Sequence, residues 1–216
     1  ELAVASWDGR IQILDVAGTV HRTLSAHTSG VLGIAFSPDG RLLASAGADN
    51  TVRIWKNFGR PPIVLRGHND WAFRVAFSPD GKLFASSSNL DGTVRLWRPD
   101  GKLLATLKAD RYSVQGLAFS PDGAVLATGG GEKVIKLWDR SGRLLRVLRG
   151  HTAQISSLAF SPNGDLLLSS SMDRTVRIWR WRSPFDVLYR QSCQLLIDAV
   201  AKTESADFSV PDGCAR

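Results

Sequence analysis

The sequence predicts an all-β protein built from repeated four-stranded sheets, and three regular spacings support this prediction. Four tryptophans recur 41 or 42 residues apart, at Trp55, Trp97, Trp138 and Trp179. A turn of the form Phe-Ser-Pro-(Asp/Asn)-Gly begins at Phe36, Phe77, Phe119 and Phe160. A histidine stands nine residues before three of these phenylalanines, at His27, His68 and His151. A period near 41 residues with these landmarks is typical of the blades of a β-propeller.

The repeat divides the chain into a partial unit at 1–26, repeats at 27–67, 68–109, 110–150 and 151–180, and a tail at 181–216. Within 27–67, short apolar segments separated by Pro, Gly, Asn and Asp predict four strands in an antiparallel meander. The partial unit lacks the first of these strands, and 151–180 supplies three. We therefore expect about four full blades plus a partial one.

The tail breaks the repeat after Arg180. Apolar residues near helical spacing predict a short amphipathic helix over 185–201. Such a helix would cover an exposed edge of the last blade or dock on a partner, and the first interpretation is favoured. The chain opens in mid-repeat without an initiator methionine, so we expect it to be a piece of a longer protein.

Stacking explains why such a repeat folds, because a sheet that is apolar on both faces is stable only against similar sheets. Three units also carry the same four polar residues. An indole only donates a hydrogen bond, a hydroxyl does both, and a neutral imidazole does one at each nitrogen, so the four can form a satisfied chain. The three sets are His27, Ser45, Asp49 and Trp55; His68, Ser86, Asp91 and Trp97; and His151, Ser169, Asp173 and Trp179.

These features make residues 1–180 resemble the WD-repeat (WD40) β-propeller family. The resemblance rests on Gly67-His68 and Gly150-His151, on the FSPDG turns, and on segments of the form D-x-T-V-R-(I/L)-W. It implies that each tetrad joins the first three strands of a blade. The similarity also suggests the C-terminal part of a bacterial multidomain protein, such as a signalling or NTPase-linked WD-repeat protein.

Two departures from the family pattern affect particular blades. The family's tryptophan is usually followed by aspartate, whereas basic residues follow three of the four here, at Lys56, Arg98 and Arg180. In 110–150, Asp110 replaces histidine and Glu132 replaces aspartate, which would place two acids at one site. We expect that blade to be looser, or one of the two acids to reach solvent.

Catalytic chemistry is not predicted. The Ser/His/Asp trios resemble a catalytic triad by residue type, but they recur with a tryptophan in three units, which favours a structural role. No pair of histidines or cysteines has zinc-ligand spacing, and 129–131 is a glycine turn without the remaining phosphate-loop residues. We therefore expect no enzyme activity, no cofactor and no metal.

Surface recognition is the predicted function, with other proteins or peptides as partners and no small-molecule substrate. The family resemblance implies contacts on the rim where the histidine loops and aspartate turns emerge. Aromatic residues and arginine are enriched in binding hot spots. The candidate partner-binding residues are Ser29, Asp70, Trp71, Leu90, Arg111, Tyr112, Gln154 and Met172.

Charge leaves a second hypothesis open. The chain has 27 basic and 20 acidic residues, a net charge of +7, which could serve nucleic acid or another anionic partner. The competing interpretation is that a basic residue is simply copied with each repeat, and a copied charge spreads around a ring. No apolar run is long enough to span a bilayer. The repeats contain no cysteine, so a reducing compartment is favoured and we expect a cytoplasmic protein.

Overall fold

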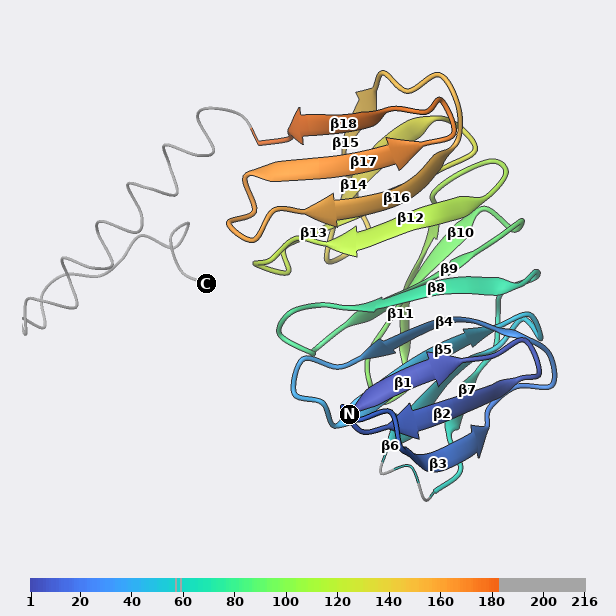
Figure 1. Cartoon of the computed structure of the whole chain (residues 1–216). Helices are drawn as coiled ribbons and strands as arrows, with labels where there is room; N and C mark the ends of the chain where they lie inside the picture. Colours follow the sequence, from blue (N-terminus) through green and yellow to red (C-terminus); the bar gives the residue numbers. More distant parts are fainter. Residues whose placement is uncertain (57, 59, 183–216) are drawn as a thin grey trace, which may run out of the picture. The chain divides into compact units, whose positions relative to one another are not determined.

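The computed structural model describes residues 1–56, 58 and 60–182. Over these residues the regular secondary structure is β-strand, arranged in five antiparallel sheets (Figure 1). All five sheets belong to one compact unit, residues 1–179, apart from the last residue of the final strand. The predicted fold class, an all-β propeller of antiparallel blades, is confirmed. The helix expected over 185–201 lies outside the described residues.

Three sheets are complete four-stranded meanders, in which each strand pairs with the next one along the chain. The first contains β4 (Val31–Phe36), β5 (Leu42–Gly47), β6 (Val52–Lys56) and β7 (Ile63–Leu65). The second contains β8 (Ala72–Phe77), β9 (Phe84–Ser88), β10 (Thr93–Trp97) and β11 (Leu103–Lys108). The third contains β12 (Val114–Phe119), β13 (Val125–Gly130), β14 (Val134–Asp139) and β15 (Leu144–Arg149).

The two terminal sheets have three strands each. The first contains β1 (Leu2–Ala5), β2 (Arg10–Leu14) and β3 (Val20–Ser25), which correspond to the second, third and fourth strands of a full blade. The last contains β16 (Ile155–Phe160), β17 (Leu166–Ser171) and β18 (Val176–Arg180), which correspond to the first three. Within the described residues, each terminal sheet therefore lacks a different strand.

The sheets pack face to face, and their first strands lie side by side. Strand β4 contacts β8, β8 contacts β12, and β12 contacts β16, as Figure 1 shows. Alternate residues of one strand are buried on opposite faces, because each interior sheet has a neighbour on both sides. Leu43 packs toward the β1–β3 sheet, whereas Ala44 packs toward the β8–β11 sheet.

A position-matched pair shows that the neighbouring sheet provides this burial. Val52 and Ile54 of β6 are fully buried between two sheets. The corresponding residues of β18, Val176 and Ile178, are 67% and 65% exposed. The residue types are the same, so the difference comes from the packing partner, as expected when stability is a sum of interfaces between neighbouring repeats.

The Ser-Pro-Asp/Asn-Gly turns all lie at one edge of the sheets, between the first and second strands; we call this the SPDG edge (residues 37–41, 78–82, 120–124 and 161–165). In the first turn the Gly40 amide donates to the Ser37 carbonyl at 2.8 Å. The Ser37 hydroxyl donates to Asp39 Oδ1 at 2.6 Å and accepts from the Leu42 amide at 2.9 Å. Because these contacts are local, each turn fixes its own hairpin.

The opposite edge carries the loops before the first strands and the turns between the second and third strands. We call it the turn face (residues 6–9, 26–30, 47–51, 67–71, 88–92, 109–113, 130–133, 150–154 and 171–175). Each of its five turns contains one residue with positive φ, namely Gly9, Asn50, Gly92, Lys133 and Arg174. The candidate residues lie on this face.

Candidate functional site

Three buried networks link the strands of three sheets just below the turn face. In the β4–β7 sheet the His27 ring contacts Asp49 Oδ1 at 2.8 Å and Ser45 Oγ at 2.9 Å, and the Trp55 indole donates to that hydroxyl at 3.1 Å. A carboxylate only accepts, so His27 donates from Nδ1 and the serine hydroxyl donates to Nε2. The same contacts join His68, Ser86, Asp91 and Trp97, and also His151, Ser169, Asp173 and Trp179.

A threonine extends each network, and the sequence reasoning gave it no role. The Thr51 hydroxyl donates to Asp49 Oδ1 at 2.7 Å. Burial opposes ionisation of Asp49, but hydrogen bonds from Thr51 and His27 outweigh it and lower the pKa of Asp49 to about 2. Burial lowers the pKa of His27, although Asp49 opposes this. The network therefore holds a neutral imidazole against an ionised carboxylate.

The geometry excludes the serines of these networks as nucleophiles. Ser45 and Ser86 are fully buried, and Ser169 is only 1% exposed. Each hydroxyl already accepts a hydrogen bond from a tryptophan and contacts a histidine. A substrate could not reach these oxygens without displacing the indole. The networks therefore have a structural role, which is to link neighbouring strands by hydrogen bonds.

The β12–β15 sheet replaces this network with a different one. Thr128 stands in the place of the serine, which sequence reasoning overlooked, and it accepts from the Trp138 indole at 2.9 Å. Asp110 accepts from the backbone amides of Tyr112 and Glu132 at 2.8 and 2.9 Å. The Glu132 carboxylate turns to Arg111 and Lys136, so the two acids do not share one site, and the polar contacts of this sheet are satisfied in another way.

Large apolar side chains are exposed along the turn face. The exposed fractions are 42% for Trp71, 65% for Leu90, 62% for Tyr112 and 61% for Met172. Backbone hydrogen bonds of 2.9 Å tie their loops together, from the Asn89 amide to the Trp71 carbonyl and from the Met172 amide to the Gln154 carbonyl. The backbone of these loops is therefore fixed at Trp71, Asn89 and Met172, and the apolar side chains face solvent.

Trp7 is the most exposed tryptophan of this face, at 72%, and sequence reasoning missed it. Its ring meets Trp71 edge to face, with centroids 6.4 Å apart and planes at 76°. A Cβ atom at Gly30 would collide with the Trp7 ring, so glycine in the intervening loop leaves room for it. The repeat could have identified Trp7, because it stands directly before the turn aspartate Asp8, as the candidate residue Leu90 stands before Asp91. We call Trp7 and Trp71 the tryptophan pair.

The remaining predicted residues also lie on the turn face, in different environments. Ser29 and Arg111 are exposed. Gln154 is half-buried and donates from Nε2 to Ser113 Oγ at 2.8 Å, which links the last sheet to its neighbour. Oδ1 of Asp70 is buried and has no hydrogen-bond partner among the described residues.

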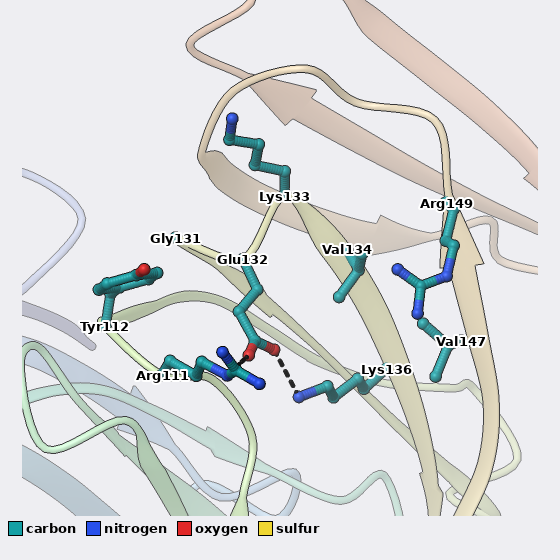
Figure 2. Close-up of a pocket in the computed structure, with 9 residues that line it drawn as sticks. All are labelled: Arg111, Tyr112, Gly131, Glu132, Lys133, Val134, Lys136, Val147 and Arg149. Atoms are coloured by element: carbon teal, nitrogen blue, oxygen red, sulfur yellow. Dashed lines mark hydrogen bonds and ion pairs between the residues drawn. The ribbon is translucent and has the colours of Figure 1, made fainter.

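A pocket of about 480 Å³ opens on the β12–β15 sheet, between its turn, its first loop and its outer strands (Figure 2). Glu132 lies inside it, 2.7 Å from Lys136 Nζ and 3.2 Å from Arg111 Nε. Strands β14 and β15 place Val134 opposite Arg149 and Lys136 opposite Val147. The lining residues are Arg111, Tyr112, Gly131, Glu132, Lys133, Val134, Lys136, Val147 and Arg149.

Within the described part of the chain, no group of three or more His, Cys, Asp or Glu side chains could hold a metal ion. The same residues contain no helix with the length and hydropathy of a membrane span.

The comparison with known families agrees with this geometry. A family model described as the IFT122 first beta-propeller matches residues 1–188. The chain belongs to this family of β-propeller domains. Its repeats are WD repeats, as their tryptophans, turns and networks indicated.

Shorter segments match curated relatives. Over 39 residues, 18% of this chain, it is 56% identical to "Cell division cycle 20.6, cofactor of APC complex" of Arabidopsis thaliana, covering 9% of that protein. Over 55 residues, 25% of this chain, it is 47% identical to "Nuclear distribution protein PAC1" of Arthroderma otae, covering 12%. Over 56 residues, 26% of this chain, it is 38% identical to "DDB1- and CUL4-associated factor 13" of Dictyostelium discoideum, covering 13%.

These matches span about a tenth of each relative, so they describe the repeat and not the whole protein. The three relatives come from a plant, a fungus and an amoeba, and they give no support to the expected bacterial origin. The names of two of them refer to association with other proteins, as a cofactor of a complex and as an associated factor.

Proposed function

We propose that this chain is a protein-interaction platform that binds partner proteins or peptides on its turn face. The observation that supports this most is the tryptophan pair, two exposed indoles that meet on the surface. Scattered exposed apolar residues are ordinary, but a cluster of large ones held in position is typical of an interaction site. Tryptophan is also among the residues that contribute most to binding energy.

The backbone around the pair supports the same proposal. The Trp71 carbonyl is fixed by the Asn89 amide, and the Trp7 ring lies over Gly30. Side chains that are already positioned lose little conformational freedom when a partner binds, which favours affinity. Leu90, in the turn that is bonded to the Trp71 loop, extends the apolar surface.

Affinity capture with matched variants tests the proposal. The bait is the 216-residue chain, compared with a Trp7→Ala/Trp71→Ala variant and with Val16→Ala. Val16 is 91% exposed and lies in the turn between β2 and β3, at the other end of these strands. We expect proteins captured by the wild type to be lost, by at least about tenfold, from the tryptophan variant and retained by Val16→Ala. An identical set of captured proteins for all three baits would contradict the proposal.

A wider part of the proposal concerns the longer protein. We infer that the platform serves as the docking part of a larger signalling or NTPase-linked protein in the cytoplasm. The supporting observation is that two relatives are named for their association with larger assemblies. The full reading frame and the location of a fluorescent fusion test this part. A frame that contains only propeller repeats, or a fusion found outside the cytoplasm, would overturn it.

A further inference from the structure

The pocket of the β12–β15 sheet carries an excess of positive charge. Its walls contain four cationic side chains, Arg111, Lys133, Lys136 and Arg149, and one carboxylate, Glu132. Glu132 is shared between Arg111 and Lys136. The side chains of Lys133 and Arg149 have no ion pair or hydrogen bond within the described residues, and both are exposed. In Figure 2, Val134 separates Arg149 from the Glu132 cluster.

The corresponding positions of the β4–β7 sheet show where this excess comes from. There Thr28 stands in place of Arg111, and Asn50 in place of Lys133, with the same left-handed φ of about 65°. Arg53, the counterpart of Lys136, donates to Asp49 at 3.3 Å and so belongs to the histidine network. That sheet therefore has two cations and one carboxylate where β12–β15 has four and one. The two additional cations, Arg111 and Lys133, stand next to the residues that replace the histidine network, Asp110 and Glu132.

We propose that this pocket binds the phosphate group of a phosphorylated serine or threonine in a partner peptide. A phosphate dianion matches a site with three positive charges in excess, and charged donors bind it about twice as strongly as neutral donors do. In Figure 2, Arg111, Lys136 and Arg149 point into the pocket from a loop and two strands, whereas the Lys133 side chain extends away from them at the turn. Clusters of basic side chains are a recurring way to recognise phosphopeptides. Tyr112, Val134 and Val147 supply apolar walls for the rest of the peptide.

A single-peptide ligand fits the surroundings better than a nucleic-acid strand. A strand would need basic groups that continue along the surface so as to follow several phosphates. In the two preceding full sheets the corresponding arginines are already occupied. Arg53 is bound to Asp49, and Arg95 donates to the Gly67 carbonyl at 2.7 Å. At this strand position the two sheets therefore add no unpaired arginine beside the pocket, although Arg66 and Lys108, the counterparts of Arg149, are exposed.

Titration of the whole chain with capped amino acids tests the inference, with backbone amide NMR signals as the readout. The probes are N-acetyl-phosphoserine methylamide, its glutamate counterpart, inorganic phosphate and a short oligothymidylate. The test variant is Lys133→Asn/Arg149→Gln, because asparagine already occupies this backbone conformation at Asn50. The matched control is Arg66→Gln, since Arg66 corresponds to Arg149 in the β4–β7 sheet.

We expect the phosphoserine probe to shift the signals of Gly131 and Lys133 saturably and to bind about tenfold more weakly to the double variant. Arg66→Gln should bind as the wild type does, and the glutamate probe should bind more weakly than phosphoserine. Equal binding of phosphoserine by the wild type and the double variant would overturn the inference. Inorganic phosphate binding as tightly as phosphoserine, or oligothymidylate competing more strongly at these signals, would overturn the choice of a peptide ligand.

This inference rests on the proposed function, but the two can fail separately. The double variant can be used as bait beside the Trp7→Ala/Trp71→Ala variant. If the tryptophan variant loses partners while titration shows no phosphoserine site, the proposed function is supported and the phosphate-binding proposal is wrong. If titration shows the site while the tryptophan variant keeps every partner, the phosphate-binding proposal is supported and the tryptophan pair is not the docking surface.

Discussion

The two edges of the same sheets differ in how similar the residues at matching repeat positions are. At the SPDG edge all four turns contain the same serine, proline and glycine, with aspartate or asparagine between proline and glycine. Their serine hydroxyls contact the nearby acidic or amide side chain at 2.6 to 2.7 Å in every copy. At the turn face the residue before each turn acid differs in every copy: Trp7, Ala48, Leu90, Gly131 and Met172.

This difference distinguishes residues that the fold requires in every sheet from residues that can vary and contact a partner. A turn that closes a hairpin imposes the same geometry on every blade, so the same residues solve it each time. The residues that vary on the turn face occupy the same turn position in every sheet, and in three of the five sheets a histidine network holds that turn. Variation on a fixed scaffold is how loops on rigid frameworks acquire binding specificity. The turn face is therefore where the repeats of this chain differ most from one another.

The largest expected effect compares two aspartates, one at each edge. Asp91 accepts from His68 Nδ1 at 3.0 Å and from the Thr93 hydroxyl at 2.7 Å. Asp91→Ala therefore removes the main acceptor of a buried imidazole N–H and leaves it only the Thr93 hydroxyl, 3.3 Å away. We expect a loss of about 3 kcal/mol in the free energy of unfolding. Asp80→Ala should cost about 1 kcal/mol, because Ser78 keeps its hydrogen bonds to Leu83.

Urea denaturation followed by tryptophan fluorescence measures both aspartate variants. The comparison would fail if Asp80→Ala proved as damaging as Asp91→Ala. In that case the turns of the SPDG edge would contribute as much stability as the histidine networks do, and the turn face would not be the more strongly stabilised of the two edges.

Acid should loosen the turn face before the SPDG edge. Burial lowers the pKa of His27 below its usual 6.5, whereas the unfolded chain takes up that proton near pH 6.5. The free energy of unfolding should therefore fall as the pH drops below 6.5, by up to about 1 kcal/mol per pH unit. At the other edge burial is outweighed by hydrogen bonds from Ser78 and Lys82, and the pKa of Asp80 is lowered to about 2. That edge loses stability only below about pH 4.

Hydrogen exchange reports the two edges separately. The Thr28 amide donates to Asp49 Oδ2, and the Lys82 amide donates to Asp80 Oδ1, each at 3.1 Å. Between pH 6.5 and 5 the protection factor of Thr28 should decrease while that of Lys82 stays constant. Parallel changes at both amides would show that His27 does not control the turn face.

The smallest expected effect concerns the tryptophan pair itself. Trp7 is 72% exposed, so replacing it with alanine removes little buried surface, whereas Trp71, at 42%, is more than half buried. Trp7→Ala should change the free energy of unfolding by less than about 1 kcal/mol, similar to Val16→Ala, and Trp71→Ala should lower it by about 1 to 2 kcal/mol. Thermal and urea denaturation of the three variants check this. A loss above about 2 kcal/mol would mark the pair as packing residues and would weaken their proposed role in binding.

Much of the fold could be predicted because the repeat encodes it locally. A shift of 41 residues identifies corresponding strands, and it correctly implied that 1–26 lacks a first strand and that 151–180 holds three. The networks could be predicted because the same four residue types recur at matching positions of the repeat and their donor and acceptor capacities complement one another. Thr51 escaped notice because it lies inside a motif whose other residues were already explained.

The less predictable features depend on where side chains point. Sequence placed Asp110 and Glu132 together, but Glu132 turns to Arg111 and Lys136 because Asp110 is already satisfied by backbone amides. The pocket follows from that rotation and from cations supplied by separate segments. The Trp7–Trp71 contact joins sheets that are not neighbours in the chain, so no local pattern could reveal it.

Site-specific photo-crosslinking tests the central claim, that partners bind the turn face, most directly. A photoreactive phenylalanine derivative can replace Trp71 at the turn face or Val16 near the opposite edge, both of which are exposed. The account predicts that irradiation in cells joins a partner protein to position 71 and not to position 16. Crosslinks to the same partner from position 16, with none from position 71, would contradict it.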